Sequence, residues 1–552
     1  MPIKRVWAPR IDFSVLRREL KLPGEFPPEA LTEAESAARE RPLPPTDLTG
    51  VPFVTIDPAT SRDLDQALHL SRAGSGYRVR YAIADVASYV RPGGPLEAET
   101  WVRGQTVYLP DGKVPLHPPV LSEDAVSLFP DVDRAAVVWT IEVDADGALG
   151  DVRLERATVR SRAKLDYPGV QAELDKGTAA EAYALLPELG TLLARRAAGR
   201  GAVNLPLPEQ EIEPDGDGWR LVLRAPLPAE EHNAQVSLLT GMAAARLMLA
   251  GGIGLLRTMP APRPEAVDRL RAAARSLGIA WPRGGSVGAV VAAVDPGDPR
   301  GAAFLDQAAE LLRGAGYTAF DDAALPAGNG PAPHGNDTAQ RASGGQGTSG
   351  GQGATGGQGG TGGQGATGGQ GATGGQGGTG GQSARGGQNA SGGQGASGGQ
   401  APSGGLPGET GHGGVGAPYA HVTAPLRRLA DRYATEVCLA LHEGRPVPEW
   451  ARAALPQLPK AMAATDRVAS AAERGAIALA EAVVLAGRVG EVFDAGVLDV
   501  DDHPKKGPGG SIALDDPAVL ARCRGDLPLG ERIRARLTTA DPATRTVEFE
   551  RV

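Results

Sequence analysis

Residues 54–70, VTIDPATSRDLDQALHL, are the most informative stretch of the sequence. They place three carboxylates, Asp57, Asp63 and Asp65, between two segments with a β-strand pattern. The residues before it, VPFVTI, have a strand pattern that Pro58 stops directly after Asp57. Asp63 and Asp65 are two residues apart, so in an extended segment their carboxylates point to one side. Like charges this close repel unless they are protonated or bridged by a cation. The stretch therefore predicts either a solvated turn or a cation site.

If a cation binds, the donors indicate which kind. Asp57, Asp63 and Asp65 offer only oxygen, and oxygen ligands select a hard ion such as Mg²⁺ or Mn²⁺. Clustered carboxylates with Mg²⁺ are typical equipment for hydrolysing phosphodiesters. By spacing alone, the solvated turn and the metal site remain equally open.

A second motif, VTAPLRRLADR, lies far along the chain. Pro425 suits the first position of a helix, which would place Arg427 and Arg428 in its first turn. The helix dipole disfavours cations there, whereas an anion such as phosphate would be bound by backbone N–H groups and guanidinium together. Pairing of these arginines with a nearby carboxylate such as Asp431 is the alternative.

Composition sets broader limits. The 552 residues allow three or four domains, and the net charge of −9 argues mildly against phosphate binding, although local patches count for more than totals. Cys438 and Cys523 are too few for a disulfide scaffold or a cysteine metal site. The N-terminus has no apolar signal core, and no uncharged apolar run reaches about 18 residues. We expect a soluble, cytoplasmic protein that does not bind membranes.

One segment departs from globular composition. Residues 327–416 repeat the themes GGQGAT and GGQGGT, and between positions 342 and 408 the one charged residue is Arg385. Such a segment has little to bury, so it cannot offset the entropy of ordering and is expected to be a disordered insertion. Stacking of the repeats into a glycine-rich structure is the alternative.

The remaining sequence alternates between strand and helix patterns. Residues 51–160 contain several short strands, and residues 166–197, 229–253 and 456–480 have helical spacing. From about Ala482, beginning with VVLAGRVGEVF, short strands alternate with Gly and Asp turns. This C-terminal pattern predicts a small five-stranded barrel.

Six motifs in one order resemble the RNB-domain exoribonucleases of the ribonuclease II and ribonuclease R family. They are TIDPATSRDLDQAL, YAIADVASYV, TVYLPDGKVPLHPPVLSEDAVSL, SRAKLDYPGV, RGAV and HVTAPLRRLADR. The resemblance covers about residues 50–325 and 417–445. It implies an α+β fold, with an RNB-type catalytic domain of mixed sheet and helices followed by a C-terminal OB-type barrel. It also implies a 3′→5′ exoribonuclease that hydrolyses single-stranded RNA to nucleoside 5′-monophosphates with Mg²⁺ or Mn²⁺.

The resemblance also implies roles for residues. Asp57, Asp63 and Asp65 match three of the family's four catalytic, metal-binding aspartates, and Asp65 matches the one most tied to catalysis. Arg427 matches the arginine that holds the scissile phosphate.

Three further residues are expected to contact RNA. Tyr108 matches an aromatic residue that stacks on the 3′-terminal base, Tyr167 is a weaker candidate of the same kind, and Arg428 lies beside the phosphate-binding arginine. Stacking of this kind tolerates any base, because every base has a π-face.

The sequence departs from the family pattern at three places. The fourth aspartate is replaced by Gln66, which offers an oxygen without charge and puts the second metal and the rate in doubt. About 50 residues precede the catalytic domain, too few for the paired cold-shock barrels of many relatives. The Gly-rich insertion interrupts the catalytic domain, at little cost in stability if its ends lie close together.

These patterns divide the chain into six expected segments. They are a short N-terminal segment (1–49), the first part of the RNB domain (50–326), the insertion (327–416), the arginine helix of the RNB domain (417–445), a helical connector (446–480) and the OB-type barrel (481–552). We expect a monomer without an obligate protein partner. Two rival hypotheses are an RNB-fold protein that binds single-stranded RNA but has lost activity through Gln66, and a scaffold dominated by the Gly-rich tract.

Overall fold

The computed structural model describes most of the chain outside the Gly-rich tract. The described residues are 5–8, 11–40, 43–203, 205, 209–215, 218–296, 298–322, 410–501, 507–517 and 519–552. Residues 323–409, which include most of the predicted insertion (327–416), lie outside this set. The predicted last residues of the insertion, 410–416, are structured, since His412 and Val415 are buried and His412 pairs with Met259. These residues therefore belong to the described part of the chain, although the prediction placed them in the insertion.

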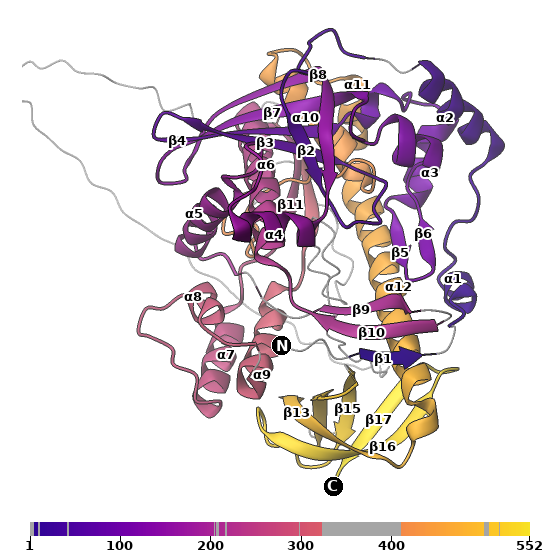
Figure 1. The fold of residues 1–552 in the computed structure, drawn as a ribbon, viewed down its shortest axis with the longest axis vertical. Helices are drawn as coiled ribbons and strands as arrows, with labels where there is room; N and C mark the ends of the chain where they lie inside the picture. The colour runs from indigo at the N-terminus through magenta and orange to yellow at the C-terminus, as the bar shows by residue number, and fades with distance from the viewer. Residues whose placement is uncertain are drawn as a thin grey trace, which may run out of the picture.

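The upper domain in Figure 1 is built on a closed five-stranded barrel in the order β2-β3-β4-β7-β8. Its strands are β2 (Phe53–Ile56), β3 (Gln66–Ala73), β4 (Gly76–Ala84), β7 (Asp133–Val143) and β8 (Leu149–Leu165). β2 runs parallel to β8, and the other pairings are antiparallel. The predicted strand-rich stretch therefore forms one mixed sheet that closes on itself.

Helices cover this barrel on two sides because its strands carry apolar side chains on both faces. Leu68, Tyr81 and Trp139 belong to the larger core, which also contains side chains of several helices. These helices include α4 (Tyr167–Lys176), α5 (Leu186–Gly199), α6 (Pro228–Gly251) and α10 (Leu429–His442). Ala67 and Ala82 face a second core that includes α2 (Pro28–Glu40) and the π-helical turn η2 (Leu121–Ala125).

A helical insertion connects the two strands of a small antiparallel sheet. β11 (Ile253–Thr258) pairs antiparallel with β12 (Gly316–Asp321), and three helices lie between them in sequence. They are α7 (Pro264–Ser276), α8 (Val287–Ala292) and α9 (Pro299–Ala309), which form a small core of their own. α9 also contacts the C-terminal barrel, so this unit lies between the two larger domains (Figure 1).

The C-terminal barrel confirms the predicted OB-type fold. Five strands close in the order β13-β14-β15-β17-β16. They are β13 (Val492–Val500), β14 (Gly509–Leu514), β15 (Leu520–Arg524), β16 (Arg532–Asp541) and β17 (Thr546–Arg551). One detail of the prediction is wrong: VVLAGRVGEVF is not a first strand. Its first residues complete the helix α12 (Leu458–Leu485) and a 3-10 turn, because Ala482 and Leu485 are buried on that helix.

α12 connects the two domains and is preceded by α11 (Glu449–Ala454). It contacts β12 and β5 (Val107–Leu109) above, and β16 and β17 below (Figure 1). A three-stranded sheet in the order β1-β10-β9 lies against it. These strands are β1 (Arg5–Ala8), β10 (Gly218–Arg224) and β9 (Glu209–Asp215). The N-terminal part of the chain thus joins the interface between the domains.

A buried carboxylate lies where these three parts meet. Glu481 on α12 accepts hydrogen bonds on Oε1 from Gln210 Nε2 of β9, at 2.9 Å, and from the backbone N–H of Leu520 of β15, at 3.0 Å. Burial raises its pKa to about 7, against the smaller lowering effect of these two donors. The folded pKa lies above the ordinary value of 4.5, so this group stabilises the fold below about pH 4.5 and loses that contribution as the pH rises through about 7.

Glu481→Gln should therefore stabilise the protein at alkaline pH. The amide resembles the protonated acid and keeps the acceptor oxygen, so we expect a gain of about 1 to 3 kcal/mol at pH 8 that shrinks towards zero near pH 5. Urea unfolding of both proteins at the two pH values measures this difference. Equal stabilities of the two proteins at both pH values would show that burial does not raise the pKa of Glu481.

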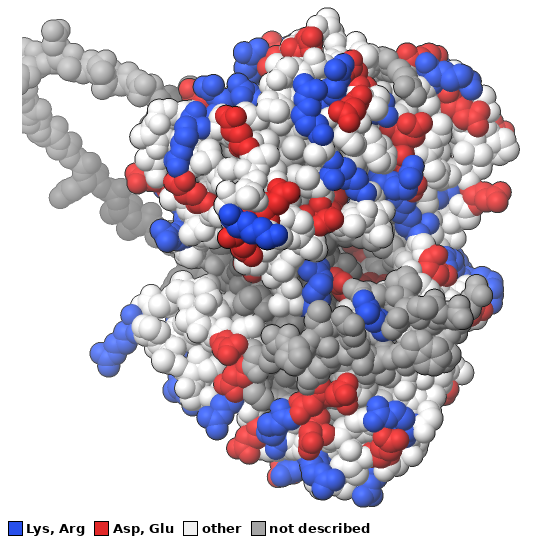
Figure 2. Space-filling model, in the orientation of Figure 1, with Lys and Arg blue, Asp and Glu red and all other residues white. Residues whose placement is uncertain are grey.

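One helix of the described residues has the length and apolar composition of a membrane-spanning segment. α6 is long and apolar enough to cross a membrane, but 56% of its apolar window is buried inside the protein. Core helices of globular domains have the same property, and α6 contributes residues such as Val236 and Met248 to the main core. On the face shown in Figure 2, basic and acidic side chains are interspersed over both domains.

Candidate active site

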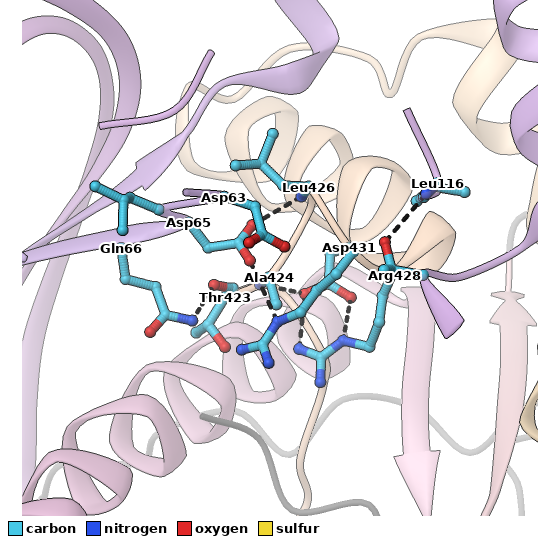
Figure 3. A network of polar contacts seen from close by, with 12 residues as sticks. Asp63, Asp65, Gln66, Leu116, Thr423, Ala424, Leu426, Arg428 and Asp431 are labelled. Atoms are coloured by element: carbon cyan, nitrogen blue, oxygen red, sulfur yellow. Dashed lines mark hydrogen bonds and ion pairs between the residues drawn. The ribbon is translucent and has the colours of Figure 1, made fainter. Parts of the chain in front are cut away.

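The aspartate loop is held by the buried residue between its two carboxylates. Leu64 is fully buried, its N–H donates to Ser127 Oγ at 2.9 Å, and its carbonyl accepts from the N–H of Leu128 at 3.0 Å. This anchor turns the flanking Asp63 and Asp65 away from the core that holds Leu64. Figure 3 shows their two carboxylates side by side. The predicted alternation is therefore confirmed, although residues 61–65 precede β3 and are not part of a strand.

Asp65 is the most enclosed acid of the group, with 3% of its surface exposed. Its Oδ1 accepts the backbone N–H of Leu426 at 2.7 Å, and its Oδ2 lies 3.2 Å from Arg427 Nε. Burial raises its pKa to about 8; Arg427 and the Leu426 N–H oppose this shift, whereas the charge of Asp63 adds to it. Burial therefore disfavours the ionised form of Asp65, although Arg427 and the Leu426 N–H favour it.

The prediction that a helix begins at Pro425 is wrong. Residues 425–427 form a turn, Arg428 makes a β-bridge with Gln105, and α10 begins at Leu429. The first turn of α10 carries Asp431, whose Oδ1 accepts the N–H of Ala424 at 2.6 Å. This carboxylate at the positive end of the helix holds the preceding turn in place, which is the usual acidic preference at a helix start.

The two arginines of the motif have different surroundings. Arg428 is 4% exposed and makes a two-pronged ion pair with Asp431, with Nε–Oδ2 and Nη2–Oδ1 distances of 2.9 Å (Figure 3). This is the alternative that the sequence left open, so the geometry does not support Arg428 as an RNA ligand. Arg427 instead reaches Asp65, and thereby joins the aspartate loop to the arginine motif.

Asp63 is held by a β-hairpin that contains the candidate Tyr108 and a second residue, Lys113, which was not a candidate. β5 (Val107–Leu109) and β6 (Gly112–Val114) pair so that Tyr108 lies directly opposite Lys113. The Tyr108 hydroxyl donates to Asp63 Oδ2 at 2.9 Å, and Lys113 Nζ lies 3.0 Å from Oδ1. Burial alone would raise the pKa of Asp63, but Lys113 and Tyr108 outweigh it and hold the pKa below its ordinary value.

Asp57 and Tyr167 also lie within electrostatic range of Arg427. Asp57 is half-buried and follows β2, where its N–H donates to the carbonyl of Leu165 at 3.0 Å. Tyr167 is 6% exposed, and Asn233 Nδ2 donates to its hydroxyl at 3.2 Å. Burial raises the pKa of Tyr167, and the charge of Asp57 raises it further. Tyr167 packs in the main core, so its ring is less accessible to a base than that of the half-buried Tyr108.

Gln66 is committed to other contacts. Its Nε2 donates to the carbonyl of Thr423 at 2.5 Å, and its Oε1 accepts the Tyr81 hydroxyl at 2.8 Å. The side chain therefore joins the aspartate loop to the turn before Arg427 (Figure 3). The carbonyl oxygen that the sequence analysis considered as a metal donor is already used.

The donor set fits a hard divalent cation. Asp57, Asp63 and Asp65 supply carboxylate oxygens, which are the ligands that Mg²⁺ and Mn²⁺ prefer. Lys113 and Arg427 stand beside two of these acids. Within the described residues, no three His, Cys, Asp or Glu side chains lie close enough together to hold a metal as they stand.

Comparison with protein families agrees with this site. Residues 45–310 match the RNB domain, and residues 491–552 match the RNase II-type exonuclease C-terminal S1 domain. The chain belongs to the RNB-domain exoribonucleases of the RNase II/R family. This is a family of hydrolytic 3′→5′ exoribonucleases that typically use Mg²⁺, and its members carry the RNB domain and S1 barrel seen in this structure. The resemblance drawn from the sequence motifs is confirmed.

Individual RNB-family relatives are distant. Ribonuclease R of Acidithiobacillus ferrooxidans is 35% identical over 191 residues, which are 34% of this chain and 44% of that protein. Mycoplasma genitalium RNase R in complex with ribose-methylated single-stranded RNA has a TM-score of 0.71 at 17% identity, covering 98% of this chain and 77% of that one. Yeast Ssd1, a pseudonuclease, has a TM-score of 0.59 at 14% identity, covering 94% of this chain and 58% of that one. The aligned segment spans less than half of that Ribonuclease R, and the structural likenesses show the fold alone.

Sequence reasoning missed Lys113 and Glu123 of this RNB-type site. Lys113 Nζ lies 3.0 Å from Glu123 Oε1 as well as from Asp63. The missed signal was the turn in YLPDGKV: a hairpin closed at Pro110 and Asp111 places Lys113 opposite Tyr108, which was already a candidate.

Proposed function

We propose that this protein is a metal-dependent 3′→5′ exoribonuclease that hydrolyses single-stranded RNA to nucleoside 5′-monophosphates. The observation that carries the proposal is the contact between Asp65 and the arginine motif. The buried Asp65 carboxylate lies 3.2 Å from Arg427 Nε, with Asp63 beside it. An acidic group suited to a cation thus adjoins a basic group suited to a phosphate, which is what phosphodiester hydrolysis requires.

The roles of the protein groups follow from their contacts. Asp57, Asp63 and Asp65 would hold Mg²⁺, which when bound supplies an activated water and charge stabilisation at the leaving oxygen. Arg427 is positioned by Asp65, so its guanidinium can bind the non-bridging oxygens of the scissile phosphate and support the charge that develops there. Tyr108 is fixed through its hydroxyl on Asp63, which places its ring next to the reacting phosphate.

The rival function is an RNB-fold protein that binds RNA without cutting it. The observation in its favour is Gln66, whose amide is bonded to Thr423 and Tyr81 and contributes no charge to the site. The structural likeness to yeast Ssd1 shows that this fold also occurs in a protein described as a pseudonuclease. A time course on a 5′-labelled single-stranded RNA, with Mg²⁺ or with EDTA, separates the two. Progressive shortening that EDTA abolishes supports the enzyme, and intact RNA that shifts in a binding gel supports the rival.

Tyr108 offers a test of how the terminal nucleotide is held. Tyr108→Ala should weaken binding of short RNA by about tenfold or more, because base–aromatic stacking contributes about 1 to 3 kcal/mol. Tyr108→Phe keeps the ring and loses the bond to Asp63, so it should bind RNA nearly as well as wild type. Fluorescence anisotropy with EDTA present measures both affinities. Equal affinities for all three proteins would remove Tyr108 from the base-binding role.

The proposal extends to the protein's context. We propose that it acts as a monomer in the cytoplasm, since nothing in its described surface or composition calls for a partner chain. Light scattering of the full chain measures its mass in solution, and cell fractionation measures its location. A dimer or a membrane-bound pool would overturn this part without affecting the chemistry.

A further inference from the structure

We propose that Lys113 is a cation built into the carboxylate site, which a divalent metal ion must displace from Asp63 onto Glu123. This inference rests on the proposed function, because it concerns the metal that the aspartates would hold. It follows from the position of one ammonium group between two carboxylates, at 3.0 Å from Asp63 Oδ1 and 3.0 Å from Glu123 Oε1.

The hairpin that carries Lys113 is a rigid platform. Val107, Leu109 and Val114 are buried, and they pack in one core with residues of α1 (Ser14–Glu19) and α12. Strand side chains alternate, so the opposite face of the hairpin presents Tyr108 and Lys113 as a cross-strand pair. Arg17 of α1 also reaches the hairpin turn, with Nη1 at 2.6 Å from Asp111 Oδ2. The backbone under Lys113 is therefore fixed, and only its side chain is able to follow a change of partner.

Both oxygens of Asp63 are engaged by this platform. Tyr108 donates to Oδ2 and Lys113 contacts Oδ1, so a metal ion that coordinates Asp63 must replace one of these contacts. The ammonium is the group to leave, because a like-charged ion at Asp63 would repel it whereas the hydroxyl is neutral. Glu123, which also lies 3.5 Å from Arg62, gives the ammonium a second carboxylate within reach of the same side chain.

A purely structural ion pair is the competing explanation. Lys113 retains 20% side-chain exposure and Glu123 24%, and exposed ion pairs contribute little to stability. A structural role predicts that removing Lys113 lowers the melting temperature and leaves metal affinity alone. Competition predicts the reverse: the affinity for a divalent ion rises, because the protein's own cation no longer has to be displaced.

The test is Mn²⁺ binding to the full chain without RNA, followed by the electron paramagnetic resonance signal of free Mn²⁺. Lys113→Met should tighten binding by about tenfold, since a charge-assisted contact of this kind contributes about 1.5 to 3 kcal/mol before solvent screening. Lys113→Arg keeps a cation on Asp63 and should stay near wild type. Glu123→Gln removes the second partner, holds the ammonium on Asp63 and should weaken binding severalfold.

Lys164 provides the matched control. Its ammonium donates to the carbonyl of Ala59 in the same aspartate-containing loop, at 2.7 Å. Lys164→Met therefore removes an equal charge from the neighbourhood, and we expect a change in Mn²⁺ affinity of less than about threefold. If Lys113→Met raises the Mn²⁺ affinity more than Lys164→Met does, the effect comes from direct competition at Asp63 and not from the loss of one positive charge near the site.

The outcomes distinguish this proposal from the proposed function. Equal Mn²⁺ affinity for wild type and Lys113→Met, including no binding by either, overturns the proposal even if RNA is cut. Tighter binding by Lys113→Met supports it even if RNA stays intact, in which case the proposed activity fails instead. Lower affinity in Lys113→Met would mean that the lysine organises the metal site, which also contradicts displacement.

Discussion

Asp65→Asn is expected to lower turnover of single-stranded RNA by about a thousandfold or more, with little change in RNA affinity. Asparagine has nearly the same shape and keeps an oxygen for the Leu426 N–H, which lies 2.7 Å from Asp65 Oδ1. It lacks the charge that pairs with Arg427 and that a divalent ion requires. The variant should therefore fold and bind RNA but fail at the chemical step.

Single-turnover kinetics with saturating enzyme measure this effect, because they exclude product release. Asp144→Asn is the matched control: Asp144 lies in the β7–β8 turn, where its Oδ1 accepts the N–H groups of Asp146 and Ala148. That control should cut RNA at the wild-type rate. If Asp65→Asn retained a rate within about tenfold of wild type, Asp65 would have no direct part in the chemistry.

Asp431→Ala is expected to destabilise the protein by about 3 to 5 kcal/mol, because it leaves the buried Arg428 guanidinium without its partner. Asp431 is fully buried and also accepts the N–H of Ala424, so the turn that carries Arg427 should loosen as well. Urea unfolding followed by circular dichroism measures the loss of stability through the midpoint and slope of the transition.

The double variant Arg428→Met with Asp431→Leu is the control for this pair. It removes both charges and fills the space with apolar groups, so it should recover much of the stability lost by Asp431→Ala. It should not recover the ordered turn, and RNA cleavage should remain low. A loss below about 1 kcal/mol in Asp431→Ala would show that water reaches Arg428 and that the pair is not a structural anchor.

The parts of the fold and site that follow local rules were predictable. The alternation of Asp63 and Asp65 about Leu64 is a property of extended backbone, and it placed the two carboxylates together. The C-terminal strand pattern was enough for a five-stranded barrel. Motif order identified the family and singled out Arg427, which the structure brings to Asp65 across more than 300 positions of sequence.

The errors came where tertiary contacts override local signals. Pro425 is an ordinary first residue of a helix, but contacts of Asp431 with Ala424 and of Gln105 with Arg428 hold residues 424–428 outside the helix, so α10 begins later. VVLAG has the apolar density of a strand, but the first of these residues continue α12 because that face is buried. Lys113 was missed because its importance depends on hairpin register and on Asp63, which is 50 positions away in sequence.

The most direct test of the central claim is the identity of the first product. RNA labelled at every phosphate would be incubated with the full chain and Mg²⁺, and the released label separated by chromatography. The account predicts nucleoside 5′-monophosphates from the earliest time points, none with EDTA, and none from Asp65→Asn. Label that stays in full-length RNA while the RNA is bound, or that appears as internal fragments, would contradict an exonuclease site built on Asp65 and Arg427.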